Sequence, residues 1–326
     1  MAFGLTGPLG PDPWLLGIAV AADLAIGDPS YPAHPVRLMG GTLSRVEAVL
    51  RRAGGDGYGG GIALFGILSV VWLGATSALA LAAAAVSPWF AKSVHLFLLY
   101  SLLALGDLLR HGWQVEAALR RGDLEAARHA VSQLVGRDTD RMDDAACRRA
   151  VVESLSENLT DGFISPIFWY ALAGLPGVVL FKVVSTMDSM VGYKSPRYLR
   201  FGWCGARLDD AMNWLPARGT WLLLALTALF VPGCSATKAL GIGWAQHGVL
   251  PSPNSGWAEA ATAGAIQRRL VGPIWMHGEL VTDVWLGDPA CPPTAIEADY
   301  RRARALVVGC GVIAAAVTIT LLAIWR

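Results

Sequence analysis

Three acidic residues in the middle of the chain are spaced so that a helix would place them in one row. Glu153, Glu157 and Asp161 follow one another at intervals of four residues. Residues four apart share a face of an α-helix, and like charges so placed repel by about a few tenths of a kcal/mol. Carboxylate oxygens are preferred ligands of Mg²⁺. The spacing therefore indicates a magnesium-binding face, and a solvated acidic helix face is the alternative.

A second acidic group lies further along the chain. Asp209 and Asp210 are adjacent, Arg207 precedes them, and Asn213 follows Asp209 by four residues. Paired carboxylates beside an arginine suit the joint binding of a metal ion and a phosphate. We therefore count Asp209 and Asp210 as candidate metal ligands and Arg207 as a candidate phosphate ligand.

Asp188 stands in an otherwise apolar run and is followed by Lys194 and Arg197. An ionisable residue in such a setting is costly and is usually functional. Lys194 and Arg197 could hold a phosphate or a carboxylate. The alternative is that these two cations only anchor the chain at the cytoplasmic surface of a membrane.

Asp28, His34 and Arg37 follow the first apolar segment. Prolines after Asp28 and His34 favour extended or turn geometry, which presents these side chains close together. The trio suits phosphate or metal binding, and a helix-terminating turn with solvated charges is the alternative.

A proline- and glycine-rich turn at 251–256 supplies polar groups. Ser252 and Asn254 offer donors and acceptors there, and Glu259 follows near a helix start, where it interacts favourably with the helix dipole. The chain has no Walker loop, G-x-G-x-x-G turn, H-E-x-x-H or G-x-S-x-G. The sequence therefore supports neither a common nucleotide loop nor a common hydrolase.

The elements that must position these residues are membrane helices. Hydrophobic residues make up 54% of the 326 residues and charged residues 16%, with a net charge of +1. Charged residues are too few to cover the surface of a soluble globule of this size. A chain so apolar is also not disordered. The net charge shows no basic excess that would point to nucleic acid as a partner. The excess apolar surface indicates a lipid bilayer as the solvent.

Six apolar segments are candidates for membrane helices, of which we expect four to six to cross. They are residues 14–26, 61–86, 94–109, 166–181, 221–231 and 305–325. The predicted fold class is all-α, a polytopic integral membrane protein with cytoplasmic-side polar helices and loops. Residues 1–326 are expected to form a single membrane-embedded helical domain.

Between the apolar segments, helical periodicity predicts polar helices over 113–121, after Asp123 and after Asp143. Basic residues concentrate in the loops at 37–52, 110–149 and 182–218, which predicts that these loops are cytoplasmic. Because both flanks of 166–181 then share a side, this segment is expected to enter the membrane and return.

The polar motifs together resemble the CobD/CbiB proteins of cobalamin synthesis, over about residues 17–305. The motifs that carry the resemblance are Gly27-Asp28-Pro29, His34-Pro35-Val36-Arg37, Gly136-Arg137-Asp138-Thr139, Val152 to Gly162, Thr186 to Lys194, Ala206 to Asp210 and Ser252 to Gly256. The resemblance implies an adenosylcobinamide-phosphate synthase of the cell inner membrane, with its active face cytoplasmic. Such enzymes join (R)-1-aminopropan-2-ol, or its O-phosphate, to the f-side-chain carboxylate of adenosylcobyric acid, with ATP and Mg²⁺.

This reaction class gives each candidate residue an expected role. A carboxylate needs phosphorylation before an amine can displace it, and phosphoryl transfer depends on positioning, metal ions and cationic clamps. The expected catalytic residues are His34, Asp188 and Lys194. The expected cofactor-binding residues are Arg37, Arg137, Arg197, Arg207, Ser252 and Asn254, and the expected metal ligands are Asp28, Glu153, Glu157, Asp161, Asp209 and Asp210.

Two other functions remain open from the sequence. A transporter would use the intramembrane residues Asp23, Asp107 and Asp188 to line a pathway. A non-catalytic scaffold would gather other cobalamin-synthesis enzymes at the membrane. The polar motifs fall in the loops while the spans are nearly free of charge, which favours the ligase.

Overall fold

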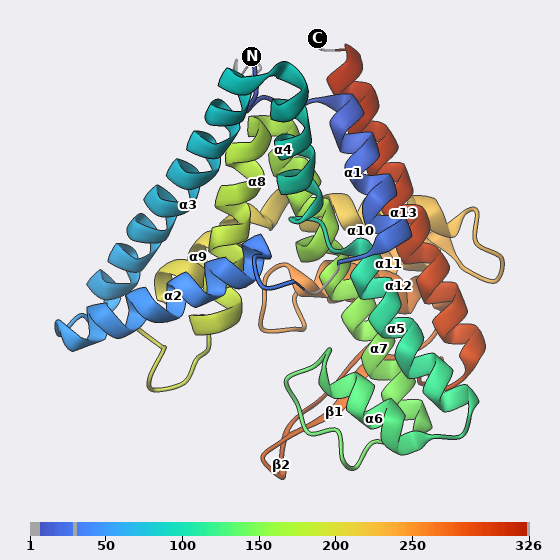
Figure 1. Cartoon of the computed structure of the whole chain (residues 1–326). Coiled ribbons are helices and arrows are strands. Elements are labelled where there is room, and N and C mark those ends of the chain that lie inside the picture. Colours follow the sequence, from blue (N-terminus) through green and yellow to red (C-terminus); the bar gives the residue numbers. More distant parts are fainter. Residues whose placement is uncertain (1–6, 29–30, 325–326) are drawn as a thin grey trace. The chain divides into compact units, whose positions relative to one another are not determined.

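The computed structural model describes residues 7–28 and 31–324, and most of these residues are helical (Figure 1). Pro29 of the first motif and residue 325 of the last apolar segment lie outside this description. The predicted all-α class is confirmed. Four helical stretches in the described residues are long and apolar enough to cross a membrane. They are Tyr58–Val86, Pro88–Arg120, Asp144–Val191 and Glu297–Ile324.

Most predicted apolar segments correspond to helices. The clearest are α1 (Pro13–Ile26), α3 (Tyr58–Val86) and α13 (Glu297–Ile324). The predicted apolar segment 94–109 covers the end of α4 (Pro88–Tyr100), a short break and the start of α5 (Leu105–Arg120). The break itself contains the buried residues Leu102 and Leu103, each 1% exposed, so hydropathy gives no sign of it.

The chain divides into two compact units. Unit 1 contains Met1–Ala104, Ser165–Asn213 and Ala315–Arg326, and unit 2 contains Leu105–Ile164 and Trp214–Ala314. The expectation of a single domain stays a prediction.

In unit 1, α2 (Pro35–Arg52), α3 and α9 (Trp203–Met212) all pack against α8 (Ser165–Val191). Buried Phe181, Val184 and Met212 form a core cluster, against which Phe65 of α3 packs. In a bilayer such side chains associate through van der Waals packing, because lipid chains are as apolar as the core itself. This packing fixes α9 against α8, which is the framework of the first acidic cluster.

α8 is broken near its middle. Ala173 and Gly174 leave the helical region, Gly174 with a φ of 60°, and Pro176 follows directly. The two halves approach so closely that a Cβ at Gly177 would lie 2.2 Å from the Trp169 carbonyl oxygen. The break divides α8 into two helical halves, and the expected entry and return of segment 166–181 stays a prediction.

The expectation that the loop begins at Lys182 was wrong, because residues 182–191 belong to α8. α8 continues to Val191, and Lys182 is buried inside it, with only 8% of its surface exposed. In the sequence, the positive charge of Lys182 indicates a loop. In the structure, this charge acts on Asp209, one of the acidic residues described below.

Unit 2 combines helices with one small sheet. Its helices are α5, α6 (Leu124–Ser132), α7 (Asp144–Leu159), the π-helix η1 (Thr160–Ile164), α10 (Trp214–Ala228), α11 (Ala236–Gln246), α12 (Ser255–Ile266) and most of α13. The predicted caps are confirmed. The Asp123 carboxylate accepts from the Ala126 N–H at 3.0 Å, and that of Asp143 from the Ala146 N–H at 2.7 Å.

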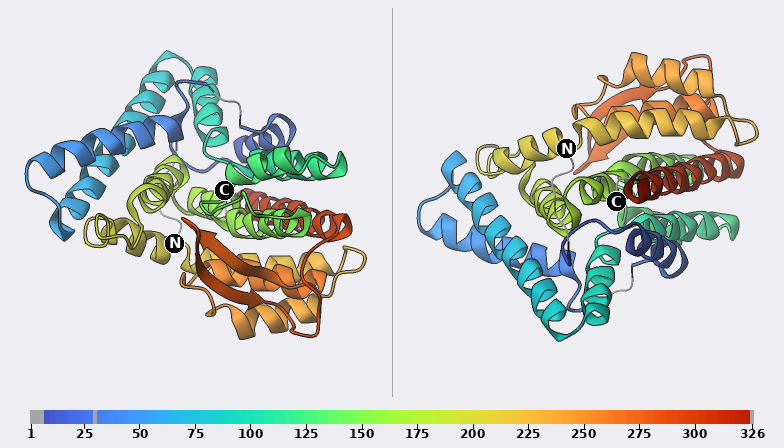
Figure 2. Two further views of the ribbon diagram at one scale, coloured as in Figure 1. Left: turned by 90° about the horizontal axis from the view of Figure 1, so that it is seen from below. Right: turned by 90° about the horizontal axis from the view of Figure 1, so that it is seen from above.

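The sequence analysis did not anticipate a β-hairpin. β1 (Leu270–Met276) and β2 (Glu279–Leu286) pair antiparallel and run alongside α12 (Figure 2). His277 and Gly278 form the turn, both with positive φ (53° and 81°), as tight hairpin turns require. Both oxygens of the Asp138 carboxylate accept backbone N–H groups of this turn, from His277 at 3.1 Å and Gly278 at 2.7 Å.

Candidate active site

The first candidate site lies in unit 1, where α9 meets α8. Gly205 allows the two helices to approach, since a Cβ at this position would lie 2.9 Å from the Met187 Cβ. The approach brings Asp209 and Asp210 of α9 within electrostatic reach of Asp188 on α8. The structure thus joins two clusters that are about twenty residues apart in the sequence.

The carboxylates of this cluster repel one another. Burial raises the pKa of Asp209 to about 7, and the charges of Asp188 and Asp210 act in the same direction. Burial also raises the pKa of Asp210, opposed by the charge of Arg207, whose Nη1 lies 3.3 Å from Asp210 Oδ2. A bound cation would relieve this repulsion.

A polar network holds Asp209 in place. The Asn213 amide donates to Asp209 Oδ2 at 2.9 Å, and the Asn213 Oδ1 accepts from the Ser165 hydroxyl at 2.5 Å. Ser165 and Asn213 are buried, at 0% and 1% exposed. Sequence reasoning did not single out Ser165. It also overlooked Lys182, whose charge opposes the increase in the pKa of Asp209.

The predicted cations of unit 1 have different surroundings. Lys194 is exposed, and its charge lowers the pKa of Asp210. The Nη2 atom of Arg197 lies 3.3 Å from a Glu47 carboxylate oxygen on α2, in an ion pair that ties the loop after α8 to α2. Arg207 and Lys194 therefore lie near the acidic cluster, whereas the ion pair gives Arg197 a structural partner.

The N-terminal trio is partly assembled. His34 Nε2 lies 2.8 Å from Asp28 Oδ1, but the geometry of this contact does not meet that of a hydrogen bond. His34 is the N-cap residue of α2, and Arg37 is exposed on the first turn of that helix. The roles of all three residues stay predictions.

The second candidate site lies in unit 2, around Arg137, Glu153 and Glu259. Arg137 Nη2 lies 2.7 Å from Glu153 Oε2, with side chains 8% and 14% exposed. Glu259 of α12 is only 2% exposed, and its Oε2 has no hydrogen-bond partner among the described residues. Burial raises the pKa of Glu259 well above its ordinary value, the charges of Glu157 and Glu153 add to the shift, and the charge of Arg137 opposes it.

Sequence reasoning missed Glu259 as a site residue and assigned it only to the helix dipole. The usable signal was its isolation, because it is the one charged residue in the Ala- and Gly-rich helix α12. A single carboxyl group on a fully buried helix is expensive and is usually functional or paired.

The predicted acidic row is only partly formed. Glu153 and Glu157 lie on α7, but Asp161 lies in η1, where the wider turn of a π-helix changes its angle about the axis. Ser252 Oγ accepts from the backbone N–H of Asn254 and Ser255, and so supports the start of α12. Asn254 is 7% exposed at the N-cap of α12.

The carboxylates of these clusters could hold Mg²⁺ only together with ligands from a bound phosphate compound such as ATP. Within the described part of the chain, no three His, Cys, Asp or Glu side chains are arranged to hold a metal ion. Proteins commonly hold Mg²⁺ with one or two carboxylates, and substrate phosphates and water supply the other ligands. Two neighbouring carboxylates are therefore enough for a Mg²⁺ site of this kind. Three of the predicted clusters lie in unit 1 and two in unit 2.

Comparisons with known proteins give a consistent result. The family model described as CobD/Cbib protein matches residues 16–307. The "Cobalamin biosynthesis protein CbiB" of Salmonella typhi is 42% identical over 275 residues, which cover 83% of this chain and 86% of that protein. The "Cobalamin biosynthesis protein CobD" of Citrobacter koseri is 40% identical with the same coverage. No solved structure matches the chain.

Proposed function

Because the chain belongs to the CobD/CbiB family, we propose that it is a membrane-embedded enzyme of cobalamin biosynthesis that forms an amide bond. Its proposed substrates are adenosylcobyric acid and (R)-1-aminopropan-2-ol or the O-phosphate of that amine. The product is adenosylcobinamide or its phosphate. Mg²⁺ and ATP are the proposed cofactor and co-substrate.

The observation that carries the ligase chemistry is the cluster of Asp188, Asp209 and Asp210 beside Arg207. Carboxylates that repel one another and have a cation at their edge suit a metal-bound phosphate. When bound, Mg-ATP supplies the phosphoryl group that converts the corrinoid carboxylate into an acyl phosphate and releases ADP, and amine attack then releases phosphate.

The chain's own residues have defined tasks in this proposal. Asp209 and Asp210 hold the cation, and Asn213 and Ser165 keep the Asp209 carboxylate oriented. Arg207 and Lys194 neutralise phosphate charge at the same edge. His34 or Asp188 removes the proton of the ammonium group, so that the nitrogen lone pair becomes available.

A second proposed cation site lies in unit 2 at two carboxylates, those of Glu157 and Glu259, with substrate phosphate and water as the further ligands. Arg137 forms an ion pair with Glu153, and the charges of Glu157 and Glu153 both act on the buried Glu259. The proposed location is the cell inner membrane with the active face in the cytoplasm, where the predicted basic loops lie.

The test is a ligation assay with detergent-purified protein. Adenosylcobyric acid is supplied with each form of the amine, with and without ATP and Mg²⁺, and product is identified by mass. We expect product only when ATP and Mg²⁺ are present. Absence of turnover under every condition would favour a scaffold, and movement of substrate across vesicles without ligation would favour a transporter.

A further inference from the structure

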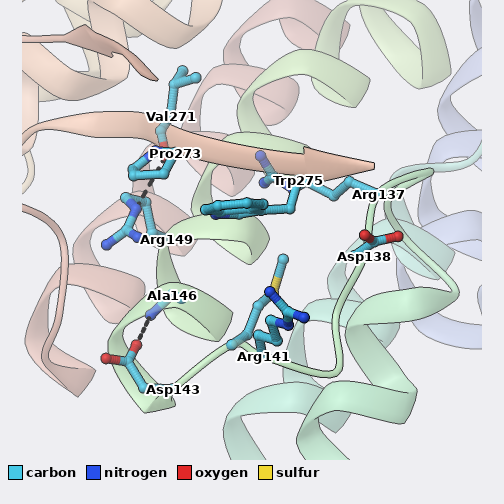
Figure 3. A pocket seen from close by; sticks show the side chains of 10 residues that line it. Arg137, Asp138, Arg141, Asp143, Ala146, Arg149, Val271, Pro273 and Trp275 are labelled. Carbon is cyan, nitrogen blue, oxygen red and sulfur yellow. Dashed lines mark hydrogen bonds between the residues drawn. The ribbon is translucent and has the colours of Figure 1, made fainter. Parts of the chain in front are cut away.

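Unit 2 contains a cavity lined by three arginines, of which Arg137 also forms the ion pair with Glu153 described above. It encloses about 190 Å³ between the loop that precedes α7, the first turns of α7 and strand β1. Its lining residues include three arginines, Arg137, Arg141 and Arg149, together with the indole of Trp275 (Figure 3). All of these residues belong to unit 2.

The arginines of the cavity have spare donors. Arg149 uses its Nε to donate to the Val271 carbonyl oxygen at 3.0 Å, which fixes the guanidinium beside β1. The buried Nε of Arg137 has no acceptor among the described residues. Arg141 is exposed and lies over the Trp275 ring at 6.0 Å. Buried donors without acceptors are rare in proteins and commonly mark the position of a ligand or ordered water.

The two carboxylates that line the cavity already accept hydrogen bonds from backbone donors. Asp138 accepts from the two turn amides of the hairpin, and Asp143 accepts from the Ala146 N–H at the start of α7. Neither carboxylate forms an ion pair with a cavity arginine in the described residues. The guanidinium groups are therefore the polar groups available to a ligand.

A further cation lies beside this group. Arg149 and Arg269 both lie over the Trp285 ring of β2, at 5.1 Å and 4.7 Å from its centroid. The hairpin thus gathers positive charge, and the Asp143 and Glu153 carboxylates act on the Arg149 guanidinium from the α7 side. Guanidinium forks match phosphate oxygens in a bidentate manner, and an indole face provides a stacking surface.

The size of the cavity limits the ligand. Pockets that enclose a whole drug-sized molecule measure about 300–1,000 Å³, so a cavity of about 190 Å³ encloses only part of a ligand. A corrin ring is much too large for it. An anionic chain of phosphates, with the rest of the molecule outside against Trp275, fits the volume and the charge.

We propose that this cavity is a phosphate-binding site that holds the phosphate chain of the nucleoside triphosphate consumed in the ligation. The inference rests on the proposed function for the identity of the nucleotide, and on the cavity alone for the phosphate chemistry. Arg141 and Arg149 contact the phosphates, and Trp275 lies against the nucleoside.

The first test is equilibrium dialysis of radiolabelled ATP against the detergent-purified full chain. Arg141→Gln and Arg149→Gln should each weaken ATP binding about 10-fold, because each removes charge-assisted hydrogen bonds. Arg121→Gln is the matched control, since Arg121 is an exposed arginine of the same unit that does not line the cavity, and it should leave binding unchanged. Unchanged ATP binding in Arg141→Gln and Arg149→Gln would overturn the proposal.

Further arms separate the possible sources of phosphate. Inorganic phosphate, the amine O-phosphate and vesicles containing phosphatidylglycerol are offered to the same variants. If only the amine phosphate or only the vesicles lose affinity in Arg141→Gln, the nucleotide assignment is overturned. If Arg141→Gln weakens the binding of ATP alone, or weakens ATP binding strongly and the binding of inorganic phosphate slightly, the nucleotide assignment stands.

The ligation assay distinguishes this proposal from the function itself. In an active enzyme, Arg141→Gln should raise the KM for ATP and leave the KM for the corrinoid unchanged. Active enzyme with an unchanged KM for ATP would overturn the cavity proposal and leave the ligase function in place. If ATP binding depends on Arg141 but the protein never ligates, the cavity proposal stands and the ligase function is overturned.

Discussion

The hydroxyl of Ser165 donates a hydrogen bond of 2.5 Å to the side-chain carbonyl of Asn213, and both residues are buried. This bond settles which end of the Asn213 amide faces Ser165, so the NH₂ group is left to donate to Asp209. The start of α8 therefore sets the orientation of a carboxylate on α9.

We predict that Asn213→Ala destabilises the protein by about 1–3 kcal/mol, because it leaves the Ser165 hydroxyl and the Asp209 carboxylate without this partner. Ligation should also fall by about 10- to 100-fold, as expected when a group that orients a metal ligand is lost. Thermal unfolding in detergent and the ligation assay measure the two effects. Thr42→Ala, which removes an exposed hydroxyl bonded within α2, is the control.

We predict that Asp209→Asn stabilises the protein at pH 8 and abolishes ligation. The pKa of Asp209 is raised from 3.8 to about 7 in the fold, so ionisation of this carboxyl group favours the unfolded state. The wild-type protein should therefore lose stability relative to the variant as pH rises from about 4 to about 7, by about 1–3 kcal/mol in total. The measurement is the difference in unfolding temperature between the two proteins across this range, in EDTA.

Addition of Mg²⁺ supplies the counterpart of that experiment. A cation bound by the ionised Asp209 should raise the unfolding temperature of the wild-type protein more than that of Asp209→Asn. Equal increases in the two proteins would remove Asp209 from the set of metal ligands.

We predict that Glu259→Gln folds at least as stably as the wild-type protein and loses most ligation activity. The substitution keeps the shape of the side chain and removes a buried ionisable group whose ionisation is opposed by burial and by the charges of Glu157 and Glu153. Glu125→Gln is the matched control in the same unit, because the Glu125 side chain is 84% exposed. If Glu259→Gln ligates at the normal rate, the second proposed cation site is wrong.

We predict that acid loosens the β-hairpin through Asp138. Hydrogen bonds from the Gly278 and His277 N–H groups lower the pKa of the Asp138 carboxyl group. The stabilisation is therefore present above the ordinary pKa of an aspartate and is lost as pH falls through the lowered value. Hydrogen exchange at residues 276–279 should increase in this acid range, and Asp138→Asn should remove most of the pH dependence.

Composition and periodicity were sufficient to predict the class of the fold and many of its helix boundaries. The caps Asp123 and Asp143 could be predicted because a capping side chain bonds to the backbone a few residues further along, so the signal is local in the sequence. The break between α4 and α5 was missed because its residues are as apolar as their neighbours. The hairpin was missed because Gly272 and Pro273 interrupt its alternation.

The candidate site could be predicted only where its members were local in sequence. Asp209 and Asp210 were found from adjacency, but the approach of Asp188 depends on how closely Gly205 lets α9 pack on α8. Glu259 was not predicted as a site residue because its burial, and the charges of Glu153 and Glu157 that act on it, depend on how α12 packs against α7. The spacing of residues along one helix does not predict which charged side chains a neighbouring helix places beside them.

The break in α8 also has a consequence for the order in which the chain folds. The carbonyl of Leu9 accepts the N–H of Leu175, just after the break, and the Pro8 carbonyl contacts the ring of His95 at 3.0 Å. The Leu9 carbonyl therefore meets this partner only after more than half of the polypeptide has been made, whereas His95 is available to Pro8 much earlier. Until residue 175 leaves the ribosome, the Leu9 carbonyl lacks the hydrogen bond that it accepts in the finished protein.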